Sequence, residues 1–292
     1  IAARDPQGFK PLCIGMNEDE YIFASESCAL DLTGAEFVRD VNPGEIVVIT
    51  NNEMKSIQTN IDAPKGLCSF EYIYFARPDS IIDGISVHKF REDAGRMLAK
   101  QKPVDADIVA GVPDSGLDAA LGFSKESGIH YDMAFTKSKY IGRTFIQNTQ
   151  GARQKLVGMK LNPLKSVVKG KRIVLIDDSI VRGTTITRII TRLREAGAKE
   201  VHLRIAAPAF VDICYFGTDI DNKEKLIAYN KTVEEIRQEV GADSLEYLSL
   251  DSLKEITKNC NIKNLCTGCF TGKYPIEVPK EIQKDRFEAI KF

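Results

Sequence analysis

The sequence predicts an α/β fold in which a parallel sheet flanked by helices follows a segment of antiparallel strands. The apolar run Ile173–Ile176 has no polar alternation, as expected for a parallel strand that is buried on both faces. The segment behind it repeats apolar residues at the i, i+3, i+4, i+7 spacing of one helix face, namely Ile186, Ile189, Ile190 and Leu193. Gly197 then provides a helix stop, and Val201–Ala207 is another strand-like run. A strand, a helix and a second strand in this order indicate a parallel βαβ unit.

The elements before this unit continue the alternation, so we expect one domain over residues 67–225. A helix near residue 90 is predicted by the spacing of Val87, Phe90, Ala94, Met97 and Leu98. A strand at residues 108–112 follows, and then a helix over Leu117–Ser127 that ends at Gly128. Residues 131–135 are predicted to form the next strand.

The two ends of the chain have different patterns. Residues 1–66 contain short extended runs broken by Gly and Pro, and the turn signal at residues 42–44 precedes the run at 45–50. We therefore expect antiparallel hairpins there. Residues 226–292 are predicted to begin with a helix over residues 232–241, capped by a threonine and stopped by a glycine, and to end in a cysteine-bearing tail that packs on the preceding domain.

The composition excludes several classes of function. The 292 residues include 40 Lys and Arg against 41 Asp and Glu, so no basic surplus indicates binding to nucleic acid. No apolar run is long enough for a membrane span, and the first residues lack the apolar core of a signal peptide. We therefore expect a cytoplasmic protein, in which the seven cysteines are reduced thiols and clustered cysteines are candidate metal ligands.

The most informative segment follows the buried strand. Two carboxylates, Asp177 and Asp178, leave its carboxyl end, and a loop with Gly183 and three hydroxyls then opens a helix. Amides of such a loop and of a helix N-terminus bind phosphate, while adjacent carboxylates suit sugar hydroxyls or Mg²⁺. The simpler interpretation is that the aspartates only cap the helix, which explains one acidic residue better than two.

The cysteine pair Cys266 and Cys269 provides a second, less specific signal. A CxxC spacing serves zinc, a redox-active pair or an iron–sulfur cluster equally well. Cys13 and Cys28 are expected to be small buried residues.

The segment IDDSIVRGTT resembles the phosphoribosylpyrophosphate (PRPP) signature of type I phosphoribosyltransferases. Four further motifs, in the right order, resemble one family specifically, the glutamine PRPP amidotransferases. They are CSFEYIYFARPDS at 68–80, VPDSG at 112–116, KYIGRTFI at 139–146 and CTGCFTGKYP at 266–275. The resemblance implies a type I phosphoribosyltransferase fold at residues 67–225, preceded at 1–66 by the C-terminal part of an N-terminal nucleophile (Ntn) glutaminase domain.

The resemblance also implies an activity and residue roles. The family forms 5-phosphoribosylamine and pyrophosphate from PRPP and ammonia, the first step of purine biosynthesis. Asp177 and Asp178 are implied to contact the ribose and Mg²⁺, with Ser115 as a further Mg²⁺ contact, and Lys139 and Arg143 are implied to act catalytically from a loop that closes over PRPP. The residues implied to cradle the 5-phosphate are Ser179, Ile180, Val181, Arg182, Gly183, Thr184 and Thr185.

A metal centre is implied in the same way, because some members of the family carry a [4Fe–4S] cluster. Its four cysteines match Cys68, Cys214, Cys266 and Cys269, and Cys260 is left over as a bystander or alternative ligand. Zinc is the second interpretation and a redox-active CxxC the third. We expect the cluster to be structural, since the chemistry moves no electron.

The family obtains its ammonia from glutamine with an N-terminal cysteine, which this chain does not have at Ile1. Arg4 and Asp31 resemble residues that hold the glutamine, so we expect a residual glutamine site without its nucleophile and no glutamine hydrolysis. Tyr72 and Tyr74 alternate in what we predict to be a strand, where both face the core or line a passage for ammonia.

The resemblance further implies feedback inhibition by purine nucleotides and a homo-oligomer. Three other functions remain open. They are a non-catalytic PRPP- or nucleotide-binding regulator on the same fold, an iron–sulfur electron carrier, and a phosphoribosyltransferase that acts on a purine base.

Overall fold

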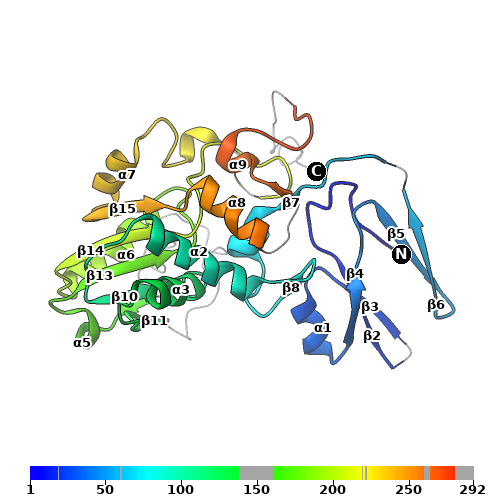
Figure 1. Ribbon diagram of the computed structural model, residues 1–292, viewed down its shortest axis with the longest axis horizontal. Coiled ribbons are helices and arrows are strands. Elements are labelled where there is room, and N and C mark those ends of the chain that lie inside the picture. Colours follow the sequence, from blue (N-terminus) through cyan, green and yellow to red (C-terminus); the bar gives the residue numbers. More distant parts are fainter. Residues whose placement is uncertain are drawn as a thin grey trace, which may run out of the picture.

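The computed structural model describes residues 1–18, 20–59, 61–137, 161–218, 220, 222–259 and 264–279. Antiparallel strands of the N-terminal segment lie at one end of the molecule, and a parallel sheet with its helices occupies the other end (Figure 1). The predicted α/β class is confirmed. In the described residues no helix is both long and apolar enough to cross a membrane.

The parallel sheet has four strands in the order β10-β13-β14-β15, and every neighbouring pair is parallel. Their bounds are Ile108–Gly111 (β10), Arg172–Asp177 (β13), Glu200–Ile205 (β14) and Ser244–Tyr247 (β15). The central strand β13 is buried along almost its whole length, which explains its unbroken apolar run. The fourth strand comes from beyond residue 225, so residues 226–292 share a sheet with the range 67–225.

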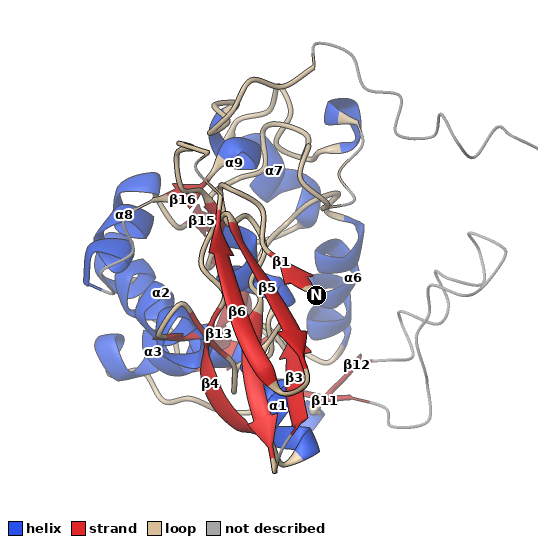
Figure 2. Cartoon of the chain, turned by 90° about the vertical axis from the view of Figure 1, so that its right-hand side faces the viewer, coloured by secondary structure: helices blue, strands red, loops and turns tan. Residues whose placement is uncertain are grey.

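Helices cover both faces of this sheet (Figure 2). One group lies beside β10 and β13, and comprises α2 at Val87–Gln101, α3 at Leu117–Ser127 and α8 at Leu250–Asn259. The other group comprises α6 at Thr184–Glu195 and α7 at Val233–Val240. Each helix predicted from the sequence is present, and α7 carries the expected cap, in which Thr232 and Glu235 bond each other's backbone N–H groups.

The N-terminal segment forms two antiparallel sheets in the orders β1-β5-β6 and β3-β2-β4, with helix α1 at Ser27–Thr33. The strands are β1 Ala2–Ala3, β2 Cys13–Asn17, β3 Glu20–Ala24, β4 Glu36–Asp40, β5 Glu45–Thr50 and β6 Glu53–Gln58. The hairpins are β2–β3 and β5–β6. The turn at residues 42–44 closes no hairpin, because β4 and β5 belong to different sheets.

Short elements complete the described chain. They are β7 Leu67–Cys68, the hairpin β8 Ile81–Ile82 and β9 Ile85–Ser86, the pair β11 Phe135–Lys137 and β12 Leu161–Pro163, helix α5 Lys165–Val168, the 3₁₀ turn Lys223–Lys225, β16 Leu265–Cys266 and α9 Gly268–Thr271. The strand predicted at residues 131–135 is wrong in extent. Only Tyr131 bridges Val109, and the strand proper begins at Phe135.

The strand predicted around Tyr72 and Tyr74 is also wrong. Glu71–Phe75 is a single π-helical turn, so the two rings do not face one side. Tyr72 is fully buried and stacks on Phe90 with ring centroids 4.8 Å apart, whereas Tyr74 is 47% exposed. The aromatic residues favour an extended strand locally, and contacts with the neighbouring helix α2 override that preference.

Candidate functional site

The two aspartates stand where parallel strand β13 ends. Asp177 is its last residue and Asp178 follows it, and their exposed fractions are only 8% and 7%. The backbone N–H of Asp178 donates to Oδ1 of Asp177 at 3.0 Å. The carboxyl end of a parallel strand is the usual place for a ligand in a sheet of this kind.

The loop between β13 and α6 opens toward solvent. Arg182, Thr184 and Thr185 are exposed and Ser179 is half-buried, whereas Ile180 is buried and Val181 accepts a bond from the N–H of Ile227 at 2.9 Å. Within the described residues, the N–H groups of Gly183, Thr184 and Thr185 have no protein acceptor. These amides and the N-terminus of α6 form an arrangement that can bind a phosphate.

Gly183 is required by the shape of this loop. Its φ of +77° is in the left-handed region, and a Cβ at this position would lie 2.3 Å from Cδ1 of Ile227. Only glycine satisfies both conditions, so the path of the loop depends on this residue.

Ser115 lies beside the acidic pair, as expected. Its hydroxyl donates to Oδ2 of Asp178, and the hydroxyl of Ser179 donates to Oδ1 of the same carboxylate. The loop that carries Ser115 contacts β13 directly, since the N–H of Val112 donates to the carbonyl of Ile176 at 2.8 Å. The sequence therefore brings three predicted Mg²⁺ contacts to one edge of the sheet.

The electrostatics of this site fit a cation. Burial and the negative charge of Asp178 raise the pKa of Asp177 well above its usual value. Burial also raises the pKa of Asp178, although the bonds from Ser115 and Ser179 and the charge of Arg91 oppose the shift. Two adjacent buried carboxylates without a contacting cation are costly, and a Mg²⁺ with its substrate phosphates would relieve that cost. Lys139 and Arg143 lie outside the described residues.

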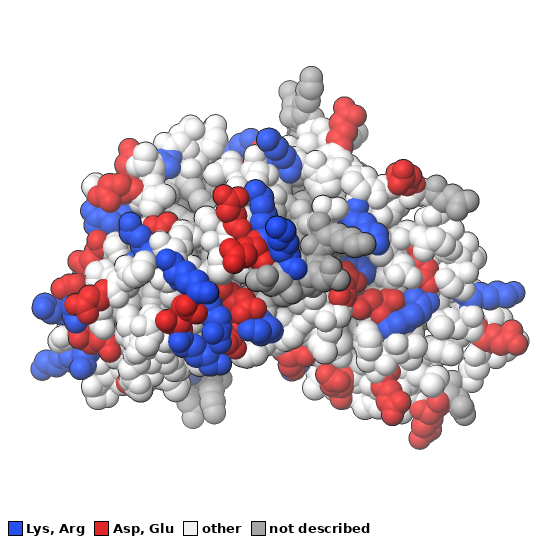
Figure 3. Space-filling view, in the orientation of Figure 1, with Lys and Arg blue, Asp and Glu red and all other residues white. Residues whose placement is uncertain are grey.

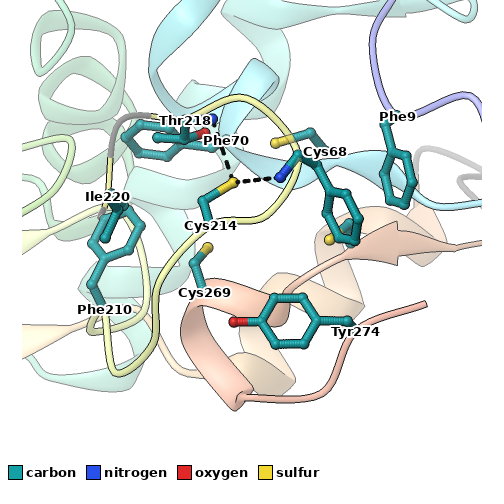
Figure 4. Close-up of a pocket in the computed structure, with 11 residues that line it drawn as sticks. Phe9, Cys68, Phe70, Phe210, Cys214, Thr218, Ile220, Cys269 and Tyr274 are labelled. Carbon is teal, nitrogen blue, oxygen red and sulfur yellow. Dashed lines mark hydrogen bonds between the residues drawn. The ribbon is translucent and has the colours of Figure 1, made fainter. Parts of the chain in front are cut away.

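The four predicted cluster ligands line one cavity. Strand β16 pairs in parallel with β7, which sets Cys266 opposite Cys68, and α9 adds Cys269. Figure 4 shows the sulfur atoms of Cys68, Cys214 and Cys269 directed into the same space. The remaining walls are mostly apolar and comprise Phe9, Phe70, Phe210, Phe216, Thr218, Ile220 and Tyr274. Cys260 lies outside the described residues.

The thiols have the surroundings of metal ligands. Backbone N–H groups of Phe216 and Thr218 each donate to Sγ of Cys214 at 3.4 Å (Figure 4). Burial raises the pKa of Cys68 to about 11, and the ammonium of Lys10 partly offsets this shift. Burial likewise raises the pKa of Cys269 and Cys266. Burial thus favours the neutral thiols, and a bound metal would supply the positive charge that stabilises them as thiolates.

The cysteine spacing bears on the kind of metal. In the described residues, no three His, Cys, Asp or Glu side chains are gathered closely enough to hold one metal ion. A tetrahedral zinc with bonds of about 2.3 Å requires sulfur atoms only about 3.8 Å apart. The four thiols share one cavity, where a zinc ion and a [4Fe–4S] cluster would use the same cysteines.

The predicted glutamine-site residues have different surroundings. Arg4 is buried and its guanidinium pairs with both oxygens of Asp83 at 2.8 and 2.9 Å. It also donates to the carbonyls of Lys10 and Val41. Asp31 is exposed on α1. The Asp83 contact connects the N-terminal segment to the hairpin before α2, which the sequence did not indicate.

Charge on the visible surface agrees with the composition. On the face shown in Figure 3, basic and acidic side chains of the described residues are interleaved, and no extended basic area is visible. Ion pairs along α2 join Lys89 with Asp93 and Arg96 with Glu92.

Comparison with known proteins agrees with this geometry. A family model for the phosphoribosyl transferase domain matches residues 84–236. Curated amidophosphoribosyltransferases from Methanocaldococcus jannaschii and Archaeoglobus fulgidus are 53% and 50% identical to this chain; the matches cover 95% and 96% of it and 62% of each relative. The chain thus spans about three fifths of these relatives.

Solved structures give the same result. The glutamine PRPP amidotransferase of Bacillus subtilis, complexed with ADP and GMP, matches with a TM-score of 0.86 and 50% identity over 95% of this chain and 62% of that one. A structure described as the allosteric regulatory enzyme of purine biosynthesis matches with a TM-score of 0.87 and 50% identity, over 96% of this chain and 61% of that one.

Proposed function

Since this chain belongs to the family of proteins with a phosphoribosyl transferase domain, we propose that it carries out the transferase reaction of an amidophosphoribosyltransferase. PRPP and ammonia would give 5-phosphoribosylamine and pyrophosphate. The bond from C1 of the ribose to the pyrophosphate oxygen breaks, a bond from C1 to nitrogen forms, and the nitrogen loses one proton to solvent. The single observation that carries the proposal is the buried acidic pair followed by the amide-lined loop of Gly183.

Different residues of this site are proposed to bind different parts of PRPP. The N–H groups of Gly183, Thr184 and Thr185 and the N-terminus of α6 suit the 5-phosphate. Asp177 and Asp178 suit the ribose hydroxyls, on the side where positive charge develops as the pyrophosphate departs. Catalysis of this kind depends on position and charge, because ammonia needs no strong base.

We propose that Mg²⁺ acts with the substrate at this site. The candidate ligands are oxygen atoms of Asp177, Asp178 and Ser115, and phosphate oxygens of PRPP would complete the coordination. The ion would neutralise charge on the departing pyrophosphate. Lys139 and Arg143 are proposed to add positive charge to the departing pyrophosphate.

We further propose a structural [4Fe–4S] cluster on Cys68, Cys214, Cys266 and Cys269. It would join the C-terminal tail to the start of the transferase domain, because β16 and β7 carry two of the ligands. Anaerobically purified protein is expected to absorb in the visible range, and Cys214→Ser is expected to remove this absorption. Stoichiometric zinc in colourless protein would contradict the cluster and favour the alternative.

Nucleotide binding and assembly are further proposals. The Bacillus subtilis protein was solved with ADP and GMP, so we propose that purine nucleotides bind to and inhibit the protein to which this chain belongs. A homo-oligomer remains a proposal of the same kind.

Release of pyrophosphate from PRPP and Mg²⁺ tests the transferase proposal. We expect release with ammonium salt. Asp178→Asn is expected to reduce the rate at least about 100-fold, since the developing charge loses a partner. Asp251→Asn, a change on an exposed side chain at the start of α8, serves as the matched control. Binding of PRPP without any release would favour the regulator instead.

A further inference from the structure

One buried side chain ties both ends of the π-helical turn Glu71–Phe75 to helix α2. Nε of Arg91 donates to the carbonyl of Tyr72 at 2.7 Å, and Nη2 donates to the carbonyl of Ala76 at 2.7 Å. These carbonyls lie at the beginning and just beyond the end of the turn. The planar guanidinium, with donors fixed in one fork, can span them, whereas a single ammonium cannot do so equally well.

Arg91 itself is held rigidly. Its exposed fraction is 4%, and it lies on the buried face of α2, next to Phe90, whose ring stacks on Tyr72. Helix α2 packs so closely on α3 that a Cβ on Gly95 would lie 1.8 Å from the carbonyl oxygen of Ala119. The helix therefore cannot shift without disturbing α3, and the position of the guanidinium is fixed.

The charge of Arg91 is not cancelled at close range. Among the described residues, the nearest carboxylate oxygen is Oδ2 of Asp118, at 4.0 Å. Burial lowers the pKa of Arg91, and the charges of Asp118 and Asp178 oppose this shift. The field of the guanidinium therefore reaches the acidic pair, where it favours the ionised form of Asp178.

Packing connects the turn that Arg91 holds with the strand end that carries the acidic pair. Phe70, which precedes the turn, packs edge-on against Phe210 with ring centroids 5.2 Å apart. Phe210 follows β14, and the N–H of Ala206, just beyond the end of β14, donates to the carbonyl of Asp177 at 2.9 Å.

Tyr74 is the one half-exposed tyrosine of this turn, and its ring packs on Phe70 with centroids 5.4 Å apart. Burial and the negative charges of Asp178 and Asp177 raise the pKa of the Tyr74 phenol. The ring of Tyr74 thus lies within electrostatic reach of the place proposed for the ribose.

We propose that Arg91 is a positioning residue for the PRPP site, which holds Tyr74 on Phe70, at the side of the sheet where β13 ends in Asp177, by clamping the turn at the carbonyls of Tyr72 and Ala76. It does not touch substrate and acts through the turn. This inference rests on the proposed function, because it assigns a support to the same substrate site.

The test compares Arg91→Met and Arg91→Lys with Arg96→Met in the full chain. Arg96 lies on the same helix, pairs with Glu92 and is partly exposed, so its replacement controls for a lost arginine on α2. We measure Mg²⁺-dependent binding of PRPP by calorimetry, steady-state release of pyrophosphate with ammonium, and the thermal transition. Arg91→Met is expected to weaken PRPP binding about tenfold or more and to lower kcat. Arg91→Lys is expected to recover less than half of the loss in binding free energy.

A double-mutant cycle with Tyr74→Ala separates positioning from mere stability. If Arg91 acts through Tyr74, Tyr74→Ala weakens PRPP binding in the natural background but adds less than about twofold to Arg91→Met. Equal effects of Tyr74→Ala in both backgrounds, or binding by Arg91→Met within twofold of Arg96→Met, would overturn the inference. Failure of the unaltered chain to bind PRPP would overturn the proposed function and this inference together. Binding by the unaltered chain without turnover would overturn only the proposed function.

Discussion

Replacement of Gly183 by alanine provides the most direct test of the phosphate loop. The left-handed φ of +77° costs an alanine about 1–2 kcal/mol. The new Cβ would also meet Cδ1 of Ile227 at 2.3 Å, far inside the about 3.5–4.0 Å of normal contact. Ile227 is buried, its exposed fraction being 3%, so relief of this overlap costs a further about 1–3 kcal/mol. The total loss of stability is about 2–5 kcal/mol.

Two further variants separate the cost of the left-handed backbone from the cost of the overlap with Ile227. Gly128 has a nearly equal φ of +74°, but a Cβ added there would have nothing within 4 Å, so Gly128→Ala is expected to lose only the backbone part. Ile227→Val removes the atom that Gly183→Ala would strike and costs about 0.5–1.5 kcal/mol alone. In the double variant the overlap disappears, which predicts a favourable coupling of about 1–3 kcal/mol.

Urea titrations give the stabilities, and calorimetry with PRPP and Mg²⁺ gives the affinities. Gly183→Ala is expected to weaken PRPP binding at least tenfold, with partial recovery on addition of Ile227→Val. The reasoning is refuted if Gly183→Ala and Gly128→Ala have equal stabilities and the double variant shows no coupling.

Three further predictions concern stability. Hydrogen bonds from Arg39 lower the pKa of the Glu45 carboxyl to about 2. The ionised carboxylate therefore stabilises the fold above about pH 4.5, and this stabilisation is lost as the pH falls toward 2. In urea titrations, Glu45→Gln should cost about 1–3 kcal/mol of stability at pH 7 and much less at pH 3. Burial and the charge of Asp83 raise the pKa of Asp40 to about 6, so its ionisation destabilises the fold as the pH rises from 4 through 6. Asp40→Asn should stabilise by about 1 kcal/mol at pH 8, after allowance for solvent screening, and by nothing below pH 4. The buried hydroxyl of Tyr247 has no hydrogen-bond partner among the described residues, so Tyr247→Phe should leave the melting temperature unchanged or raise it.

Local signals were sufficient for the elements that position the phosphate loop. The apolar run of β13 and the periodic face of α6 each depend on residues within one element, and the glycine between them already indicated a special turn. The capped helix α7 was predictable for the same reason, since its cap involves Thr232 and Glu235 only.

Contacts between distant segments could not be read from the sequence in this way. Tyrosines such as those of the π-helical turn are typical of strands. The two hydrogen bonds that hold this turn come from Arg91, which belongs to the later helix α2. A signal for Arg91 was nevertheless present. It falls on the apolar stripe of α2 beside Phe90 and Ala94, where a charged residue needs a buried partner.

The acidic pair and the cysteine cavity share one short segment, and this affects how variants of either site are interpreted. Cys68 and Phe70 line the cavity, and Phe70 also packs on Phe210, which follows the strand beside Asp177. Lys10 pairs with Glu71 at 2.5 Å and so adds a second connection between the cavity and the turn. A change at Cys68 is therefore expected to disturb the proposed transferase site through the backbone. Cys214 lies on a separate loop, so Cys214→Ser is the variant that can separate a loss of the proposed metal centre from a loss of the turn.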